Sequence, residues 1–112
     1  MKKNMPLNDG LLNQIQSSRI KFDLENTFRV MGLVHNEKYD FWSFPSGIDS
    51  VEQFSIRDLV SMDENGDWNK TEVQVKISGP NGERWYHPKI AIMRIQELIN
   101  EIFESYAQKR DS

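Results

Sequence analysis

The stretch TEVQVKISGPNGERWYHP, residues 71–88, carries the clearest structural signal in the sequence. From Thr71 to Ser78, apolar and polar residues alternate, which is typical of a strand with one buried face. The GPNG segment at residues 79–82 predicts a turn, because proline presets φ at one position and glycine accepts the left-handed conformation. The stretch therefore predicts a β-hairpin whose second strand covers residues 83–87.

A second hairpin is predicted upstream of this one. The dipeptide Asn65-Gly66 is the strongest short-range signal for a hairpin turn. It joins a strand over residues 55–62 to the strand that begins near Trp68. Three consecutive strands therefore form an antiparallel meander.

A long helix is predicted downstream of the meander. Pro88 can occupy the first helical turn, where its missing N–H group costs nothing. Beyond it, apolar residues recur at three- and four-residue steps and form one stripe on a helix surface. These residues are Ile92, Ile95, Leu98, Ile99, Ile102 and Tyr106. The pattern predicts a helix over residues 88–108 that packs on one face of the sheet.

The N-terminal part of the chain predicts a short helix followed by two strands. Asn8 or Asp9 can cap a helix that ends near residues 17–18. Apolar and charged side chains then alternate over residues 20–25, so we expect a strand there and a second strand over residues 28–34.

A helix that begins at Asp23 is the alternative for this region. It would place Leu24, Phe28 and Met31 on one face. We favour the two strands because Gly32 and the β-branched residues weaken a helix.

These elements together predict an α+β fold. Residues 39–44 add a further strand, which ends at the turn segment Pro45-Ser46-Gly47. A length of 112 residues fits one domain. We expect a single α+β domain over residues 1–112, with a mostly antiparallel sheet of four to six strands, a long C-terminal helix packed on one face and a short N-terminal helix.

The composition restricts the setting of the protein. The chain has no cysteine, so disulfide and thiolate chemistry are excluded. No apolar run approaches the roughly 20 residues that a membrane span needs, and Asn4, Asn8 and Asp9 interrupt the N-terminus where a signal peptide is apolar. We expect a cytoplasmic protein without membrane association.

No motif predicts a metal site, a cofactor or an active site. The segment DENGD, residues 63–67, resembles the start of a calcium loop, but Trp68 and Gln74 stand where such a loop requires glycine and glutamate. His35 and His87 lack a second ligand at metal spacing, and no paired His–carboxylate pattern is evident. We expect no metal, no cofactor, no catalytic residues and no enzymatic activity.

The acidic residues concentrate in the middle of the chain. Residues 37–67 carry eight acidic and two basic side chains, whereas the net charge of the whole chain is only -3. A surface of this charge would attract a basic protein and repel nucleic acid. The sequence therefore favours a protein partner with a basic surface, and it specifies no oligomeric state.

The aromatic segment YDFWSFP, residues 39–45, has two interpretations. It can be a central strand buried on both faces, or it can expose one aromatic pair as an anchor for a partner, since aromatic residues are enriched at interface hot spots. The second interpretation combines with the acidic charge to give a predicted partner-binding set: Asp40, Trp42, Phe44, Asp49, Glu52 and Asp58.

The resulting functional hypothesis is a small acidic, non-catalytic binding or regulatory protein. An inhibitor or immunity-type protein that blocks a basic target fits this size and charge distribution. The alternative is a nucleic-acid-associated module that uses Arg84, Trp85 and Lys89, where Trp85 stacks on bases. For Trp85 itself we favour a core position beneath the terminal helix.

Overall fold

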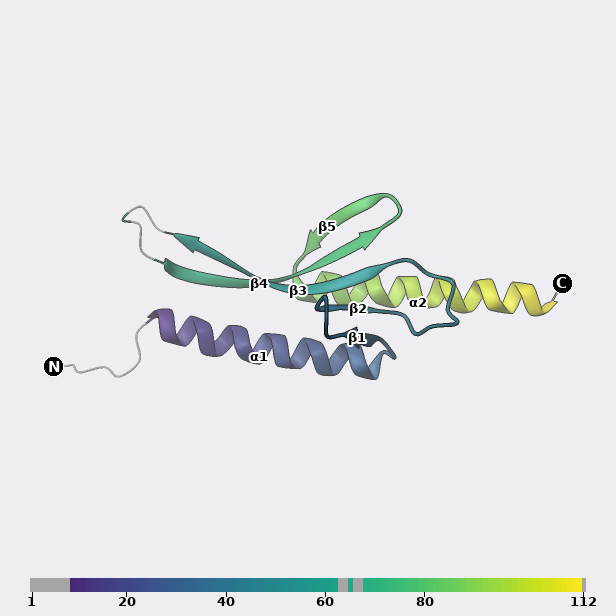
Figure 1. Ribbon diagram of the computed structural model, residues 1–112, viewed down its shortest axis with the longest axis horizontal. Helices are drawn as coiled ribbons and strands as arrows, with labels where there is room; N and C mark the ends of the chain where they lie inside the picture. The colour runs from purple at the N-terminus through teal and green to yellow at the C-terminus, as the bar shows by residue number, and fades with distance from the viewer. Residues whose placement is uncertain (1–8, 63–64, 66–67, 112) are drawn as a thin grey trace.

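Among the described residues, five strands and two helices form a two-layer α+β fold (Figure 1). The computed structural model describes residues 9–62, 65 and 68–111. The elements, in chain order, are α1 (Asp9–Val30), β1 (Val34–Asn36), β2 (Phe41–Ser43), β3 (Gln53–Met62), β4 (Trp68–Gly79), β5 (Gly82–Tyr86) and α2 (Pro88–Asp111). The strands form one antiparallel meander in the order β1-β2-β3-β4-β5. The predicted fold class is confirmed.

Both helices cover the same face of the sheet. Because strand side chains alternate between faces, the buried residues Val73, Val75 and Ile77 of β4 all point to this side. They form one apolar core with Phe28 of α1 and Ile95 of α2. No helix of the described residues covers the opposite face of the sheet (Figure 1). An antiparallel sheet tolerates this, since the outer residues of β4 are mostly polar.

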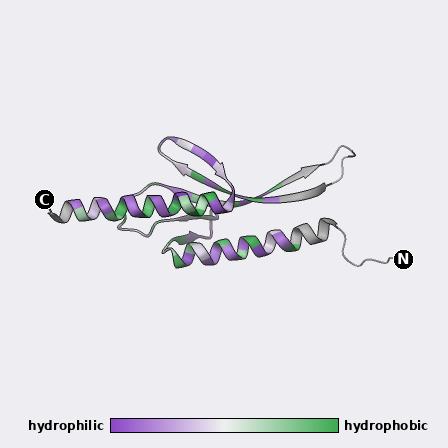
Figure 2. Ribbon diagram, turned by 180° about the vertical axis from the view of Figure 1, so that it is seen from behind, coloured by the Kyte–Doolittle hydropathy of each residue, from purple (hydrophilic) through white to green (hydrophobic). Residues whose placement is uncertain are grey.

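The helix α2 forms as the apolar periodicity predicts. It begins at Pro88, and its residues Ala91, Ile95 and Leu98 are buried in the core. Figure 2 shows hydrophobic and hydrophilic residues alternating along the helix. The backbone N–H of Ala91 donates to the carbonyl of His87 at 2.9 Å, which closes the first turn. The helix extends to Asp111, three residues past the predicted end.

The two strands predicted over residues 20–25 and 28–34 were wrong. The N-terminal helix does not end near residue 18 but continues as α1 to Val30, and only Val34 of that region belongs to a strand. Leu24 and Phe28 face the sheet one helical turn apart, as the alternative interpretation had placed them. Ile20 and Phe22, whose alternation suggested a strand, lie on the exposed surface of the helix.

Gly32 ends α1, and its role as a helix terminator explains why a helix was not favoured from the sequence. Its φ of 91° is left-handed, and its N–H group donates to the carbonyl of Arg29 at 3.0 Å. The N–H group of Leu33 donates to the carbonyl of Phe28 at 3.0 Å, and the Leu33 side chain is buried. These are the two hydrogen bonds and the apolar contact of a Schellman motif. The glycine that seemed to weaken a helix is the residue that terminates it.

The strand predictions for the second half of the chain are confirmed with small shifts in their ends. β3 pairs with β4, and β4 pairs with β5, in the predicted meander. The further strand predicted over residues 39–44 is β2, with Tyr39 and Asp40 in the turn before it. The DENGD segment and the Asn65-Gly66 turn lie outside the described residues except for Asn65.

The conformation of Gly32 generates a prediction about stability. We expect Gly32→Ala to lower the free energy of unfolding by about 1–2 kcal/mol, because alanine is strained at a left-handed φ. Gly79→Ala is the matched control: Gly79 has no positive φ, and a new Cβ there would make an ordinary contact with Cγ of Glu52 at 3.6 Å. Its effect should stay within about 0.5 kcal/mol. Urea unfolding of both variants measures the difference, and equal losses would contradict the proposed cap.

The packing of α2 generates a second prediction from two isoleucines of one helix. Ile95 is 0 % exposed and Ile90 is 50 % exposed. Ile95→Ala should lower the free energy of unfolding by about 2–5 kcal/mol, because it empties a core site. Ile90→Ala should lower it by less than about 1 kcal/mol. Thermal or urea unfolding checks the contrast, and a larger loss for Ile90 would mean that α2 presents another face to the sheet.

Candidate functional site

The second half of α2 and the loop of residues 44–52 lie opposite each other and enclose a groove, here called the α2 groove. The hydroxyl of Tyr106 donates to the carbonyl of Gly47 at 3.1 Å and ties the helix to the loop. The loop itself is held by the N–H group of Ile48, which donates to the carbonyl of Pro45 at 3.2 Å. Gly47 has a left-handed φ of 97°, which the turn requires.

One half of the groove is an apolar compartment with a volume of about 190 Å³. Ile99 and Phe103 from α2 form one side, Phe44 and Ile48 from the loop form another, and Met31 from the end of α1 closes it. The ring of Phe44 packs edge-on against Phe54, with 5.6 Å between centroids, so the core fixes this wall. Phe103 stays 68 % exposed although it lines a concave apolar surface.

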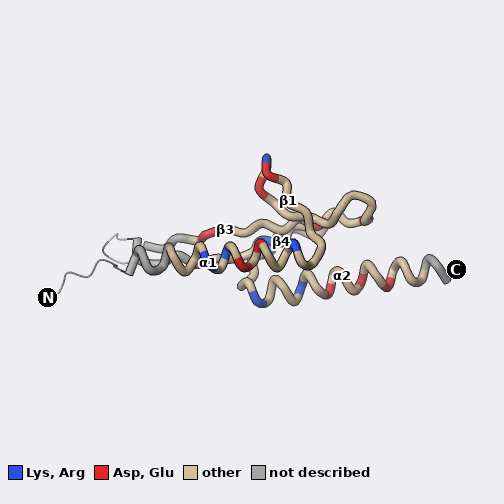
Figure 3. The backbone as a smooth tube through the Cα atoms, turned by 90° about the horizontal axis from the view of Figure 1, so that it is seen from below, with Lys and Arg blue, Asp and Glu red and all other residues tan. Residues whose placement is uncertain are grey.

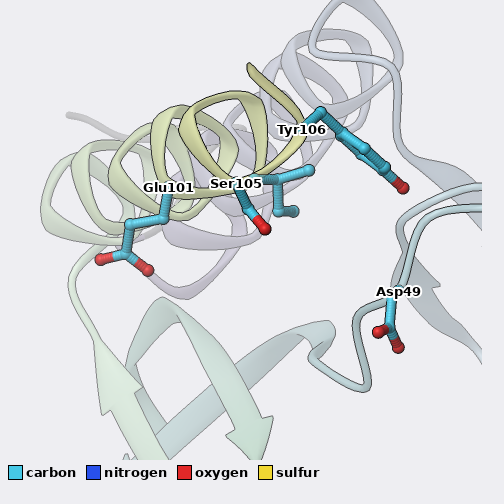
Figure 4. A pocket seen from close by; sticks show the side chains of 5 residues that line it. Asp49, Glu101, Ser105 and Tyr106 are labelled. Atoms are coloured by element: carbon cyan, nitrogen blue, oxygen red, sulfur yellow. The ribbon is translucent and has the colours of Figure 1, made fainter. Parts of the chain in front are cut away.

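The other half is an acidic compartment with a volume of about 150 Å³ (Figure 4). Glu101, Ser105 and Tyr106 project from α2, and Asp49 lies across from them on the loop. Ile102 and Tyr106 line both compartments, so the two halves adjoin each other.

The carboxylates of the acidic compartment are only weakly compensated. Asp49 makes no ion pair with any residue that the structure describes. Glu101 lies 3.9 Å from a guanidinium nitrogen of Arg94, whose closer partner is Glu97 at 2.8 Å. The hydrogen bond to Glu97 is the main cause that raises the pKa of Arg94 above its ordinary value. Between Lys89 and Glu104 of α2, the basic residues precede the acidic ones (Figure 3).

The structure brings two of the six predicted partner-binding residues to this groove. Phe44 lines the apolar compartment and Asp49 lines the acidic one. Glu52 lies on the same loop but lines a different pocket, beside the turn between β4 and β5. It also accepts a hydrogen bond from the hydroxyl of Ser50.

The other two predicted carboxylates are paired elsewhere. Asp58 points toward α1 and forms an ion pair with Lys21 at 2.8 Å. Asp40, in the turn between β1 and β2, contacts His35 at 2.9 Å and Arg57 at 3.4 Å. These carboxylates therefore do not gather at one site, and Figure 3 shows acidic residues distributed over both helices and the sheet.

Trp42 is a core residue and presents no anchor at the surface. It is 2 % exposed and opposes Phe54 across β2 and β3. The ring of His35 stacks on it at 4.7 Å, the guanidinium of Arg29 lies 5.3 Å from its ring centre, and the edge of Phe28 contacts it at 5.6 Å. Of the two interpretations of the aromatic segment, the buried one describes Trp42.

The basic–aromatic patch of the alternative hypothesis is divided by the sheet. Arg84 opposes Ile77 on the helix-covered face, whereas Trp85 opposes Lys76 on the open face. Trp85 is 46 % exposed, and the ammonium of Lys76 lies 5.9 Å from its ring centre. The core position predicted for Trp85 was therefore wrong, because the alternation of β5 turns its side chain away from α2.

The pair formed by His35 and Asp40 was missed by the sequence reasoning, which found no paired His–carboxylate pattern. The two residues flank the turn between β1 and β2, and the side chain of Asn36 shapes that turn by accepting a hydrogen bond from the N–H group of Tyr39 at 3.1 Å. An aspartate five positions after a histidine, across a tight turn, was the available signal. No hydroxyl of the described residues hydrogen-bonds to His35, so a nucleophile that would complete a catalytic triad is not found there.

Within the described residues, no group of three or more histidine or acidic side chains is arranged to hold a metal ion. In the same part of the chain, no helix combines the length and the apolar character that crossing a bilayer requires. Comparison of the chain with protein-family models, with curated proteins and with solved structures found no significant match.

The different settings of the two tryptophans generate a prediction. Trp42→Ala should lower the free energy of unfolding by about 3–5 kcal/mol, because it empties the core beside Phe28. Trp85→Ala should lower it by about 1 kcal/mol, because its ring is half exposed. Chemical unfolding followed by circular dichroism measures both values. If Trp85→Ala lowered the free energy of unfolding more than Trp42→Ala, then Trp85 and not Trp42 would be the core residue.

Proposed function

We propose that this chain is a small, non-catalytic protein-binding domain that contacts another protein through the α2 groove. The single observation that carries the proposal is Phe103, a large aromatic side chain left 68 % exposed at a concave apolar surface. Isolated exposed apolar residues need no explanation, but an aromatic residue beside an apolar cavity is the usual composition of a recognition hot spot.

The geometry also supports a role as a regulator. The walls of the groove come from Met31 and Gly32 after α1, from the loop of residues 44–52 and from α2. The core holds the two helices, and the bond of Tyr106 to Gly47 holds the loop. A preformed surface of this kind binds with little ordering cost. An inhibitor or immunity-type protein would act in this way, by covering a functional surface of its target. A cysteine-free chain of this size is compatible with action in the cytoplasm.

The nucleic-acid hypothesis has less support. Arg84 and Trp85 point to opposite faces of β5, so one strand of nucleic acid cannot contact both side chains on one surface. The residues described around the α2 groove include no lysine or arginine, and its carboxylates would repel phosphates.

A pair of substitutions on α2 tests the proposal. Phe103→Asp places a charge at the mouth of the apolar compartment, and it should weaken binding of the natural partner by at least about tenfold, as the loss of a hot-spot residue does. Met93→Asp is the matched control, because Met93 is 60 % exposed on the same helix but lines neither compartment. It should leave the affinity within about twofold of the wild type.

The measurement is calorimetric titration with the partner that the tagged wild-type chain recovers from its native cells. The melting temperatures of both variants serve as the control for folding. If the two variants bind equally well, or if Met93→Asp is the weaker binder, the α2 groove is not the contact surface. Binding of random single-stranded DNA or RNA that Arg84→Ala weakens would favour the nucleic-acid hypothesis instead.

A further inference from the structure

We propose that the occupant of the α2 groove is a protein segment in which a large apolar side chain lies next to a lysine or arginine. This inference rests on the proposed function and adds the chemistry of the partner. It follows from the sizes of the two compartments, from their charge and from the wall that they share.

The apolar compartment fits one large side chain. A cavity of roughly 150 Å³ lined by aliphatic and aromatic residues is sufficient to bind benzene. The compartment measures about 190 Å³, and Met31, Phe44 and Phe103 supply a lining of the same character. A leucine, methionine or phenylalanine of the partner therefore fills it, and burial of that side chain provides the affinity.

The acidic compartment selects a cation. Asp49 and Glu101 are the charged residues among its described lining, and both are acidic. Arg94 contacts Glu101 only at 3.9 Å and is hydrogen-bonded to Glu97 at 2.8 Å, so it compensates Glu101 weakly. A lysine or arginine of the partner would be attracted by the charges of Asp49 and Glu101, whereas an aspartate or glutamate would be repelled.

The shared wall sets the spacing of the two partner side chains. Ile102 and Tyr106 line both compartments, so the apolar position and the cationic position are neighbours. Residues i and i+2 on one face of a strand, or i and i+4 on one face of a helix, are about 5–7 Å apart. The apolar and basic residues of the partner should therefore lie within four positions of each other.

Selection from a phage-displayed library of random 12-residue peptides on the full chain tests the inference. The selected peptides should be enriched in a large apolar residue within four positions of lysine or arginine. A synthetic peptide from this selection should bind Asp49→Lys and Glu101→Lys about tenfold or more weakly than the wild type, because attraction becomes repulsion. Glu104→Lys makes the same charge change outside the lining and should alter the affinity by less than about twofold at 0.15 M salt, where screening is strong.

The outcomes separate this inference from the proposed function. Apolar peptides without a basic residue, bound by the wild type and lost on Phe103→Asp, would overturn the cationic occupant and leave the protein-binding groove in place. If the Phe103→Asp variant binds the selected peptides as tightly as the wild type does, both proposals are overturned. Both proposals are also overturned if the selection enriches no peptide. Equal weakening by Glu104→Lys and Glu101→Lys would show a general charge effect and would also overturn the cationic occupant.

Discussion

The contact of Phe28 with Trp42 and Phe54 is the interaction on which the arrangement of the molecule depends. Phe28 is fully buried, and its ring lies 5.6 Å from that of Trp42 and 6.5 Å from that of Phe54. These three rings join α1 to β2 and β3, which are distant from the helix in sequence. Large buried aromatic side chains contribute more apolar burial than any other residues. Together with Leu24, which is buried in the same core, this contact holds α1 on the sheet.

The same contact also positions the α2 groove. Phe44 follows β2 by one residue and packs on Phe54, while Met31 follows α1 and reaches the same apolar compartment. The walls of the groove are thus short extensions of core elements, and only the loop between Pro45 and Glu52 is held mainly by its own hydrogen bonds and by Tyr106. A recognition surface built on a rigid core needs little reorganisation when a partner binds.

Sequence reasoning predicted those parts of the fold where burial follows a regular period. β4 and α2 each bury one face, so the alternation at Val73, Val75 and Ile77 and the helical spacing of Ile95 and Leu98 were informative. The prediction failed in α1 for two reasons. The exposed Ile20 and Phe22 produce an alternation that is typical of a strand, and Gly32 ends the helix and does not interrupt it. For the candidate site it identified Phe44 and Asp49 but not their neighbours on α2. Pairing of loop residues with a helix about 50 positions away depends on tertiary packing, which no local pattern encodes.

Gly32 belongs both to the end of α1 and to the lining of the apolar compartment. A Cβ atom at this position would meet no atom within 4 Å, so space alone would admit an alanine. The left-handed φ of Gly32 nevertheless disfavours residues that have a Cβ atom. Any inherited change that let α1 continue past Val30 would carry Met31 and Gly32 with it and reshape the groove. The end of α1 and the shape of the α2 groove are therefore linked in this fold.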